Sequence, residues 1–236
     1  MLCKAEHAGP ARITVLQWPH SEFSLSVQKF HRNAGLLDGG LIVLALFVLV
    51  TAIINREWMY VLFAAWLVAN LRLGALSAGW DFQWLERSIP PEWVAPMRQL
   101  TIAAYYTLTY ALFWRLFGED LRQPAHARLL KVAQWTCVLI IGYAVVLPFK
   151  YFLPPMWLTA LIGVMVLMYL MIHMLVEKRS KVAMWYGASL GIAVFANLYE
   201  VIAAALGYKG FIGAVNSVTA ALSSSLMAAF AIAEQM

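Results

Sequence analysis

This sequence has little charge and no polar segment long enough to fold as a separate soluble domain. Charged residues make up 12% of its 236 residues, whereas hydrophobic residues make up 63%. Its two cysteines, Cys3 and Cys137, are too few and too different in environment to indicate a disulfide framework. The chain is therefore not expected to function as a soluble or disulfide-stabilised domain.

The residues that membrane enzymes and pigments require are also missing. Lys209 precedes the last hydrophobic block and no lysine lies within that block, which excludes a retinal Schiff base. Four of the five histidines lie in the N-terminal tail or in a loop, which argues against a metal hydrolase. Ser77-Ala78-Gly79 has no membrane histidine to act as its base, so it does not indicate a nucleophile elbow. We predict no catalytic residues, no metal site and no cofactor, and expect these residues not to form an enzyme.

What the sequence does contain is seven hydrophobic blocks, each close to the roughly 20 residues needed to cross a bilayer. Short polar or proline-rich connections separate them. The blocks cover approximately residues 35–54, 58–79, 97–117, 132–147, 156–176, 182–206 and 211–233. We therefore predict an all-α integral membrane protein, in which residues 34–233 form a seven-transmembrane helix bundle surrounded by the lipid bilayer.

The two ends of the chain differ from the blocks. Residues 1–33 contain no apolar core of the kind that a cleaved signal peptide requires, and we expect this tail to be poorly ordered or interfacial. Residues 234–236 contain no Gly, Asn or Pro that would end the seventh helix. We interpret them as the start of a cytoplasmic linker helix that continues into another module.

The distribution of lysine and arginine between the two sides of the membrane indicates the orientation. With the C-terminus inside, the inner loops hold Arg56, Arg115, Arg122, Arg128, Lys131, Lys178, Arg179 and Lys181, and the outer loops hold Arg87, Arg98, Lys150 and Lys209. The tail adds Lys4, Arg12, Lys29 and Arg32 to the outer side, which removes the excess of basic residues on the inner side. Weighting the hairpin loops above the tail, we predict an outside N-terminus and a cytoplasmic C-terminus in a bacterial inner membrane.

Inner-leaflet anchoring explains the net charge of +5, so we expect no nucleic-acid partner.

Ionisable groups within the membrane are costly and are therefore candidates for function. Arg72 in the second block and Glu200 in the sixth both lie roughly 10 Å from the outer ends of their blocks, at a rise of 1.5 Å per residue. Asn197 shares a helix face with Glu200, and Tyr105 and Tyr106 lie at a similar depth. We predict a polar cluster of Arg72, Asn197, Glu200, Tyr105 and Tyr106. It either binds a small ligand or ion, or it only bridges helices, with Arg72 also able to extend to the headgroups.

Small residues recur at every fourth position of the seventh block: Gly213, Ser217, Ala221, Ser225 and Ala229. Such a ridge allows helices to approach closely. Packing within one bundle is favoured slightly over a homodimer interface, and the sequence does not separate the two.

A methionine series, Met165, Met168, Met171 and Met174, lies beside His173 and offers ligands suited to Cu(I). Because a spacing of three turns each residue about 60° from the last, the four side chains do not converge on one site. Packing explains the series better than metal binding does.

Two segments carry a family resemblance: WLVANLRLGALSAGWDFQW at residues 66–84 and IPPEWVAPMRQLTIAAYYTLTYALF at residues 89–113. The chain resembles the membrane region of bacterial seven-transmembrane receptors with diverse intracellular signalling modules. It is most similar to versions that precede GGDEF or GGDEF-EAL domains, which make or degrade cyclic di-GMP. The resemblance implies a fused or associated cytoplasmic output module. No GGDEF or EAL motif occurs in these residues, so a diguanylate cyclase or phosphodiesterase activity would belong to the full-length parent.

The preferred interpretation is a sensory and transducing domain in which a stimulus moves the seventh helix and so controls the output module. The alternative is a small transporter or an ion or copper permease subunit, although no internal repeat and no mid-block proline support it. A third interpretation is an assembly scaffold, in which Arg72 and Glu200 would affect only the abundance of the protein.

Overall fold

The computed structural model describes residues 19–77, 83–84, 87–88, 90–121, 123–206 and 213–234, with some helical residues described by their backbone alone. This part of the chain contains seven helices, as the sequence predicted, and the all-α fold class is confirmed. The helices are α1 (His20–Asn55), α2 (Trp58–Ser77), α3 (Pro91–Phe117), α4 (Pro124–Val146), α5 (Phe149–Lys178), α6 (Lys181–Leu206) and α7 (Gly213–Glu234).

Prolines mark the beginnings of four helices. Pro19 and Pro148 are the N-caps of α1 and α5, and Pro91 and Pro124 occupy the first turns of α3 and α4. Proline is suited to these positions because it lacks the N–H that would have no partner within the helix. The sharp turns after α1 and α5 are made by Arg56 and Arg179, whose φ angles of 55° and 47° are left-handed.

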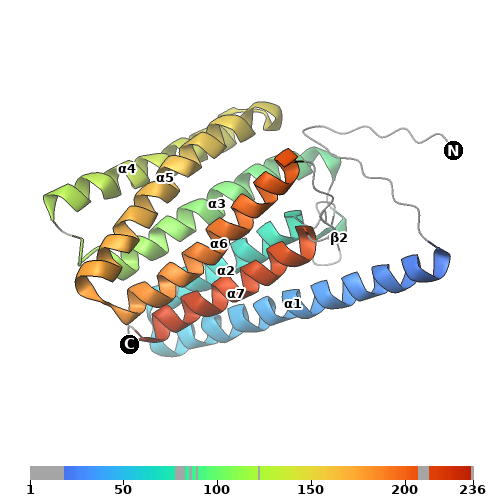
Figure 1. Ribbon diagram of the computed structural model, residues 1–236, viewed down its shortest axis with the longest axis horizontal. Helices are drawn as coiled ribbons and strands as arrows, with labels where there is room; N and C mark the ends of the chain where they lie inside the picture. Colours follow the sequence, from blue (N-terminus) through green and yellow to red (C-terminus); the bar gives the residue numbers. More distant parts are fainter. Residues whose placement is uncertain are drawn as a thin grey trace.

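Three helix starts differ from the expected blocks. Helix α1 begins at His20, inside the expected tail, and Figure 1 shows its N-terminal part extending past the other helices. Helix α3 begins at Pro91 rather than near residue 97, since prolines are accommodated in a first turn. Helix α5 begins at Phe149 and includes Pro154 and Pro155, which had been placed in the proline-rich connection before the block at residues 156–176.

The connection between α2 and α3 contains a small antiparallel pair of strands. Strand β1 (Gln83–Trp84) pairs with β2 (Arg87–Ser88), with Gln83 opposite Ser88 and Trp84 opposite Arg87. The sequence predicted only that this connection is polar or rich in proline. The strand pair is its only regular element in the part of the connection that the structure describes.

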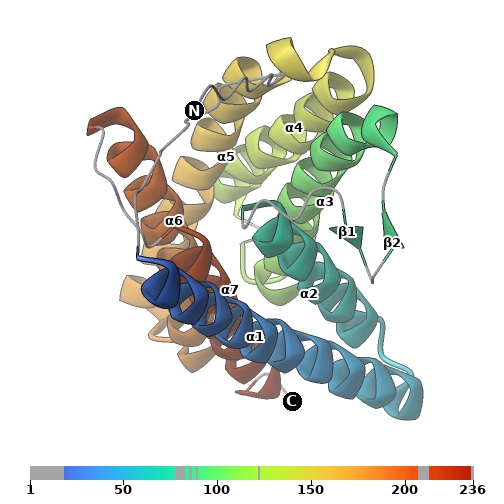
Figure 2. The same ribbon diagram turned by 90° about the vertical axis from the view of Figure 1, so that its right-hand side faces the viewer.

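The helices form a bundle in which each contacts its neighbours along the chain, and α7 closes the arrangement by contacting α1, α2 and α6. Helix α3 lies between α2 on one side and α4 and α5 on the other (Figure 2). The larger hydrophobic core contains residues of all seven helices. A smaller core joins α3, α4 and α5 through Ala103, Ile140, Ala144, Phe152 and Met156.

Length and composition identify three membrane-spanning candidates among the described residues: Trp58–Leu76, His126–Val146 and Phe149–Lys178. Shorter apolar segments are Gly39–Asn55, Lys181–Ala196 and Thr219–Glu234. Helix α3 is long but more polar than these segments. It can still lie in a membrane bundle, because its polar side chains have hydrogen-bond partners on other helices. Gln99, Tyr106 and Tyr110 form hydrogen bonds to neighbouring helices, so they do not face lipid unpaired.

Candidate functional site

The middle of α7 is attached to α2 by hydrogen bonds inside the bundle. Asn70 of α2 is 4% exposed, and its Nδ2 donates to Ser225 Oγ at 3.0 Å and to the Ala221 carbonyl at 3.3 Å. Ser225 Oγ in turn donates to the Ala221 carbonyl at 2.7 Å. The Asn70 Nδ2 donor and the Ser225 hydroxyl thus each have a partner, as the interior of a membrane protein requires.

The opposite side of α7 is attached to α6 in the same way. Ser189 Oγ donates to the Ser224 carbonyl at 2.8 Å and lies 3.0 Å from Ser224 Oγ. Both serines are buried. Because Ser224 and Ser225 are adjacent in the helix, they point to different neighbours, so α7 is held between α2 and α6 at a single level. We call Asn70, Ser189, Ser224 and Ser225 the α7 polar contacts.

Arg72, the predicted centre of the sensing cluster, is 6% exposed in α2. The backbones of Asn197 and Glu200 lie in α6, but their side chains are outside the described residues. A buried guanidinium in this position keeps Arg72 a candidate for ligand sensing or for helix bridging. The pairing of Arg72 with Glu200 stays a prediction.

Tyr105 lies on the side of α3 that faces α2. Its ring stacks on Trp66, with centroids 6.0 Å apart and an interplanar angle of 25°. Trp66 Nε1 donates to Thr109 Oγ1 at 2.9 Å, and Tyr186 of α6 donates its hydroxyl to the Thr109 carbonyl at 3.1 Å. Tyr105 and Thr109 are therefore at a junction of α2, α3 and α6.

Tyr106 lies on a different side of α3, against α4 and α5. Its hydroxyl is 3.1 Å from Thr136 Oγ1 and 3.5 Å from the Ala160 carbonyl. A Cβ atom at Gly163 would lie 1.6 Å from Tyr106 Oη, so only glycine fits there. The two tyrosines are thus not in one group: Tyr105 contacts α2, and Tyr106 is packed between α4 and α5.

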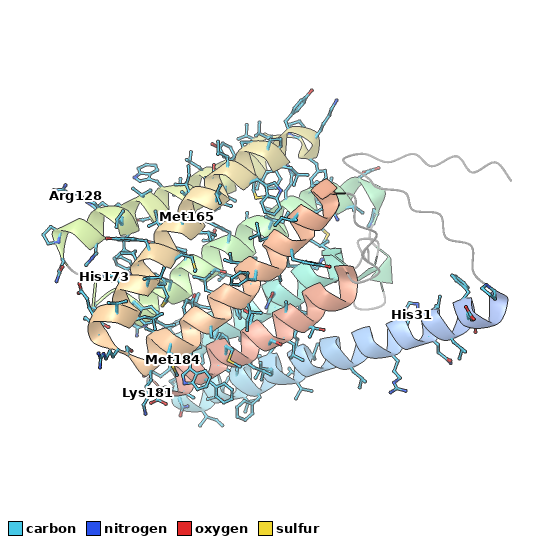
Figure 3. All side chains as sticks on the ribbon, in the orientation of Figure 1. His31, Arg128, Met165, His173, Lys181 and Met184 are labelled. Carbon is cyan, nitrogen blue, oxygen red and sulfur yellow. The ribbon has the colours of Figure 1, made fainter. Side chains whose placement is uncertain are left out.

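Charged side chains gather where α5 ends and α6 begins. Lys178 pairs with Asp120, His173 Nε2 lies 3.1 Å from Glu177 Oε2, and Lys181 Nζ lies 3.2 Å from Glu234 Oε1. Figure 3 shows Lys181 and His173 near this end of the bundle. The Lys181–Glu234 pair links the beginning of α6 to the end of α7.

The family described as 7TM diverse intracellular signalling matches residues 33–235, which is nearly the whole chain. The chain belongs to this family. No curated protein and no solved structure gave a match. The resemblance read from residues 66–84 and 89–113 is confirmed, and the chain is a membrane protein of a signalling family. Its association with GGDEF or EAL modules stays a prediction.

The small-residue ridge of this 7TM signalling domain contributes to the bundle through the members that the structure describes. Ser225 is completely buried against α2, and Ala221 and Ala229 pack on the main core. The side chains of Gly213 and Ser217 are outside the described residues. At Ser225 the ridge serves packing within one bundle.

The methionine series of the domain does not gather at one place. Met171 and Met174 are buried, whereas Met165, labelled in Figure 3, is 64% exposed. Among the described residues, no group of three His, Cys, Asp or Glu side chains could hold a metal ion.

Sequence reasoning predicted Ser225 as part of the small-residue ridge but missed its partnership with Asn70, and it missed Ser189 and Ser224 altogether. The available signal was the occurrence of serines inside apolar blocks, because a hydroxyl in a membrane helix needs a partner. Which helix supplies that partner depends on how the bundle closes. One sequence does not contain that information.

Proposed function

We propose that this chain is the sensory and transducing part of a receptor in a bacterial inner membrane. Its seven helices cross the membrane, with the N-terminus outside and the C-terminus in the cytoplasm. A stimulus changes the position of α7, and α7 passes the change to a cytoplasmic output module. By family resemblance, that module is a diguanylate cyclase or a cyclic di-GMP phosphodiesterase.

The observation that carries this proposal is the way α7 is held. Its middle is attached through small side chains to α2 and α6, at Ser225 and Ser224. Its end carries one exposed ion pair, Lys181–Glu234. Short hydroxyl contacts can exchange partners along a helix without repacking large side chains at their own level, so the middle of α7 is suited to adopt two positions.

A ligand shifts such an equilibrium only if it binds the two arrangements unequally. The candidate source of this difference is the predicted cluster of Arg72, Asn197 and Glu200, because Arg72 is buried in α2 only two residues from Asn70. A ligand that displaced α2 or α6 at this level would change the contacts of α7. This assignment gives the cluster a role beyond bridging helices.

The test uses the full-length receptor, with output measured as cellular cyclic di-GMP at equal protein abundance. Asn70→Leu and Ser189→Ala each remove one side of the α7 polar contacts, and we expect a changed basal output. Ser223→Ala is the matched control, because Ser223 lies in the same turn and makes no hydrogen bond within the described part of the chain. Unchanged output in both contact variants would refute transduction through α7.

The sensing role is tested separately with Arg72→Gln. If the cluster senses the stimulus, the response to it falls while the receptor remains abundant. If Arg72 serves only to bridge helices, abundance falls and the response per molecule stays the same. The second result would remove Arg72 from the sensing mechanism without affecting the role of α7.

A further inference from the structure

A hollow of about 370 Å³ lies on the surface of the bundle, between the beginning of α2 and the end of α3. It is lined by Trp58, Met59, Val61, Leu62, Ala65 and Arg115. The volume falls within the range of roughly 300–1,000 Å³ that is usual for small-molecule sites. The wall is hydrophobic except at Arg115.

The spacing of residues in α2 creates this groove. Trp58, Val61 and Ala65 follow one another at intervals of three and four, so they lie on one face of the helix. All three are exposed, and Trp58 is 80% exposed. Ala65 is the small member, and it leaves open the space that a larger side chain would fill.

Arg115 gives the groove one charged end. It is exposed in the last turn of α3 and forms no hydrogen bond or ion pair with any residue that the structure describes. Lys178 and Lys181, by contrast, each contact a carboxylate. The guanidinium of Arg115 is therefore able to bind an anion from outside the chain, and its planar donors suit a phosphate.

We propose that this groove binds one phospholipid with an acidic headgroup. The acyl chain lies along Trp58, Val61 and Ala65, and the phosphate accepts hydrogen bonds from Arg115. Trp58 is the first residue of α2 and Arg115 is near the last residue of α3, so both are at the depth where headgroups meet the hydrocarbon. The proposal depends on the chain being a membrane protein and not on α7 transmitting a signal.

Native mass spectrometry of the purified full chain tests the charged end. Phosphatidylglycerol and phosphatidylcholine with identical acyl chains are titrated in detergent. We expect one retained phosphatidylglycerol, with a preference of about fivefold over phosphatidylcholine, the factor expected for one basic residue near an anionic lipid. Arg115→Gln removes the preference and Arg115→Lys keeps part of it. Arg128→Gln, which changes an exposed arginine in the first turns of α4, leaves it unchanged.

The hydrophobic part of the groove is tested with Ala65→Phe, which fills it and lowers the binding of both lipids. Ala104→Phe is the control, because Ala104 is an exposed alanine of α3 outside the groove. Glycerol phosphate, added as a headgroup without acyl chains, should not displace the lipid. Displacement by it would overturn the lipid assignment in favour of a soluble phosphate.

Wild-type lipid preference in Arg115→Gln would overturn the proposal, as would an equal loss of preference in Arg128→Gln. Circular dichroism confirms that each variant retains its helices. Should Ala65→Phe not fold, Arg115→Gln alone decides the question, because it changes only an exposed side chain.

Discussion

The bundle joins its helices differently on the two sides of α3. Towards α4 and α5, long side chains of α3 reach backbone carbonyls: Gln99 donates to Leu147 at 2.8 Å and Tyr110 to Leu130 at 3.2 Å. Towards α7, the hydrogen bonds are made by Asn70 and three serines, and the rings of Trp185 and Phe230 also pack α6 against α7. The hydrogen bonds of α3 to α4 are thus made by long side chains, and those that hold α7 by short ones.

Under the proposed function, α3, α4 and α5 form a frame that stays in place, and α7 is the helix that moves. Shifting α5 against α3 would force Tyr106 into the backbone at Gly163, where there is no room for even a Cβ atom. At the level of Ser224 and Ser225, shifting α7 exchanges one hydroxyl partner for another. The proposed transduction needs both properties, since a movement can be transmitted only relative to parts that stay in place.

The largest expected effect on the free energy of unfolding comes from filling the tight contact between Tyr106 of α3 and Gly163 of α5. Gly163→Ala places a methyl group 1.6 Å from Tyr106 Oη, and overpacking of this kind costs about 1–3 kcal/mol. The free energy of unfolding, measured by titration with SDS, should fall by that amount. Tyr106→Phe in the same chain should restore part of the loss, because it removes the clashing oxygen.

Gly142→Ala in α4 is the control for that experiment. Nothing lies within 4 Å of a Cβ atom at Gly142, so alanine there should stabilise the helix by up to about 1 kcal/mol. If Gly163→Ala and Gly142→Ala have the same effect, the frame is not held by close packing at Gly163.

The next effect in size concerns the α2 side of α7. Asn70→Leu removes the hydrogen bonds to Ser225 Oγ and the Ala221 carbonyl. Side-chain hydrogen bonds between membrane helices contribute about 0.6 kcal/mol on average and about 1.7 kcal/mol at most. Ser225 keeps its bond to the Ala221 carbonyl, so no new buried donor is left without a partner. SDS titration should therefore show a smaller loss than for Gly163→Ala, and an equal or larger loss would contradict the contrast between the two sides.

A still smaller effect is expected on the α6 side. Ser189→Ala removes one hydroxyl that contacts Ser224, and the free energy of unfolding should fall by about 0.6 kcal/mol. The same titration on Ser223→Ala should give a change near zero. Equal losses in the two variants would show that any serine in this region matters to the same extent, whatever its contacts.

The sequence predicted the seven helices well because hydrophobic length is a local property that each segment displays alone. Helix ends were predicted less well. Pro154 and Pro155 were placed in a connection, yet both lie in the second turn of α5, where each removes one helical hydrogen bond without ending the helix. The early start of α1 at His20 was also missed, because residues 20–34 mix polar and apolar residues without a continuous apolar block, and the side chains described there are exposed.

The candidate site was harder to predict because it consists of contacts between side chains on different helices. Arg72 and Asn70 were recognisable as polar residues in an apolar block. The separation of Tyr105 from Tyr106 follows from their adjacent positions, since successive helical residues point about 100° apart. The sequence analysis had grouped the two tyrosines only by their similar depth in the membrane. The Asn70–Ser225 bond joins residues far apart in the chain, and only the closed bundle shows it.

The smallest expected effect is at the end of α7, where Lys181 meets Glu234. Their side chains are 75% and 40% exposed, so water and salt screen the attraction, and such pairs contribute between about 0 and 1 kcal/mol. A double-mutant cycle of Lys181→Gln and Glu234→Gln should give a coupling of a few tenths of a kcal/mol at low salt, following the same principle, and none at high salt. A coupling that persisted in high salt and exceeded that of the serines would mean that the end of α7, rather than its middle, determines the position of the helix. In that case the contrast between the two sides of α3 would not explain how α7 is held.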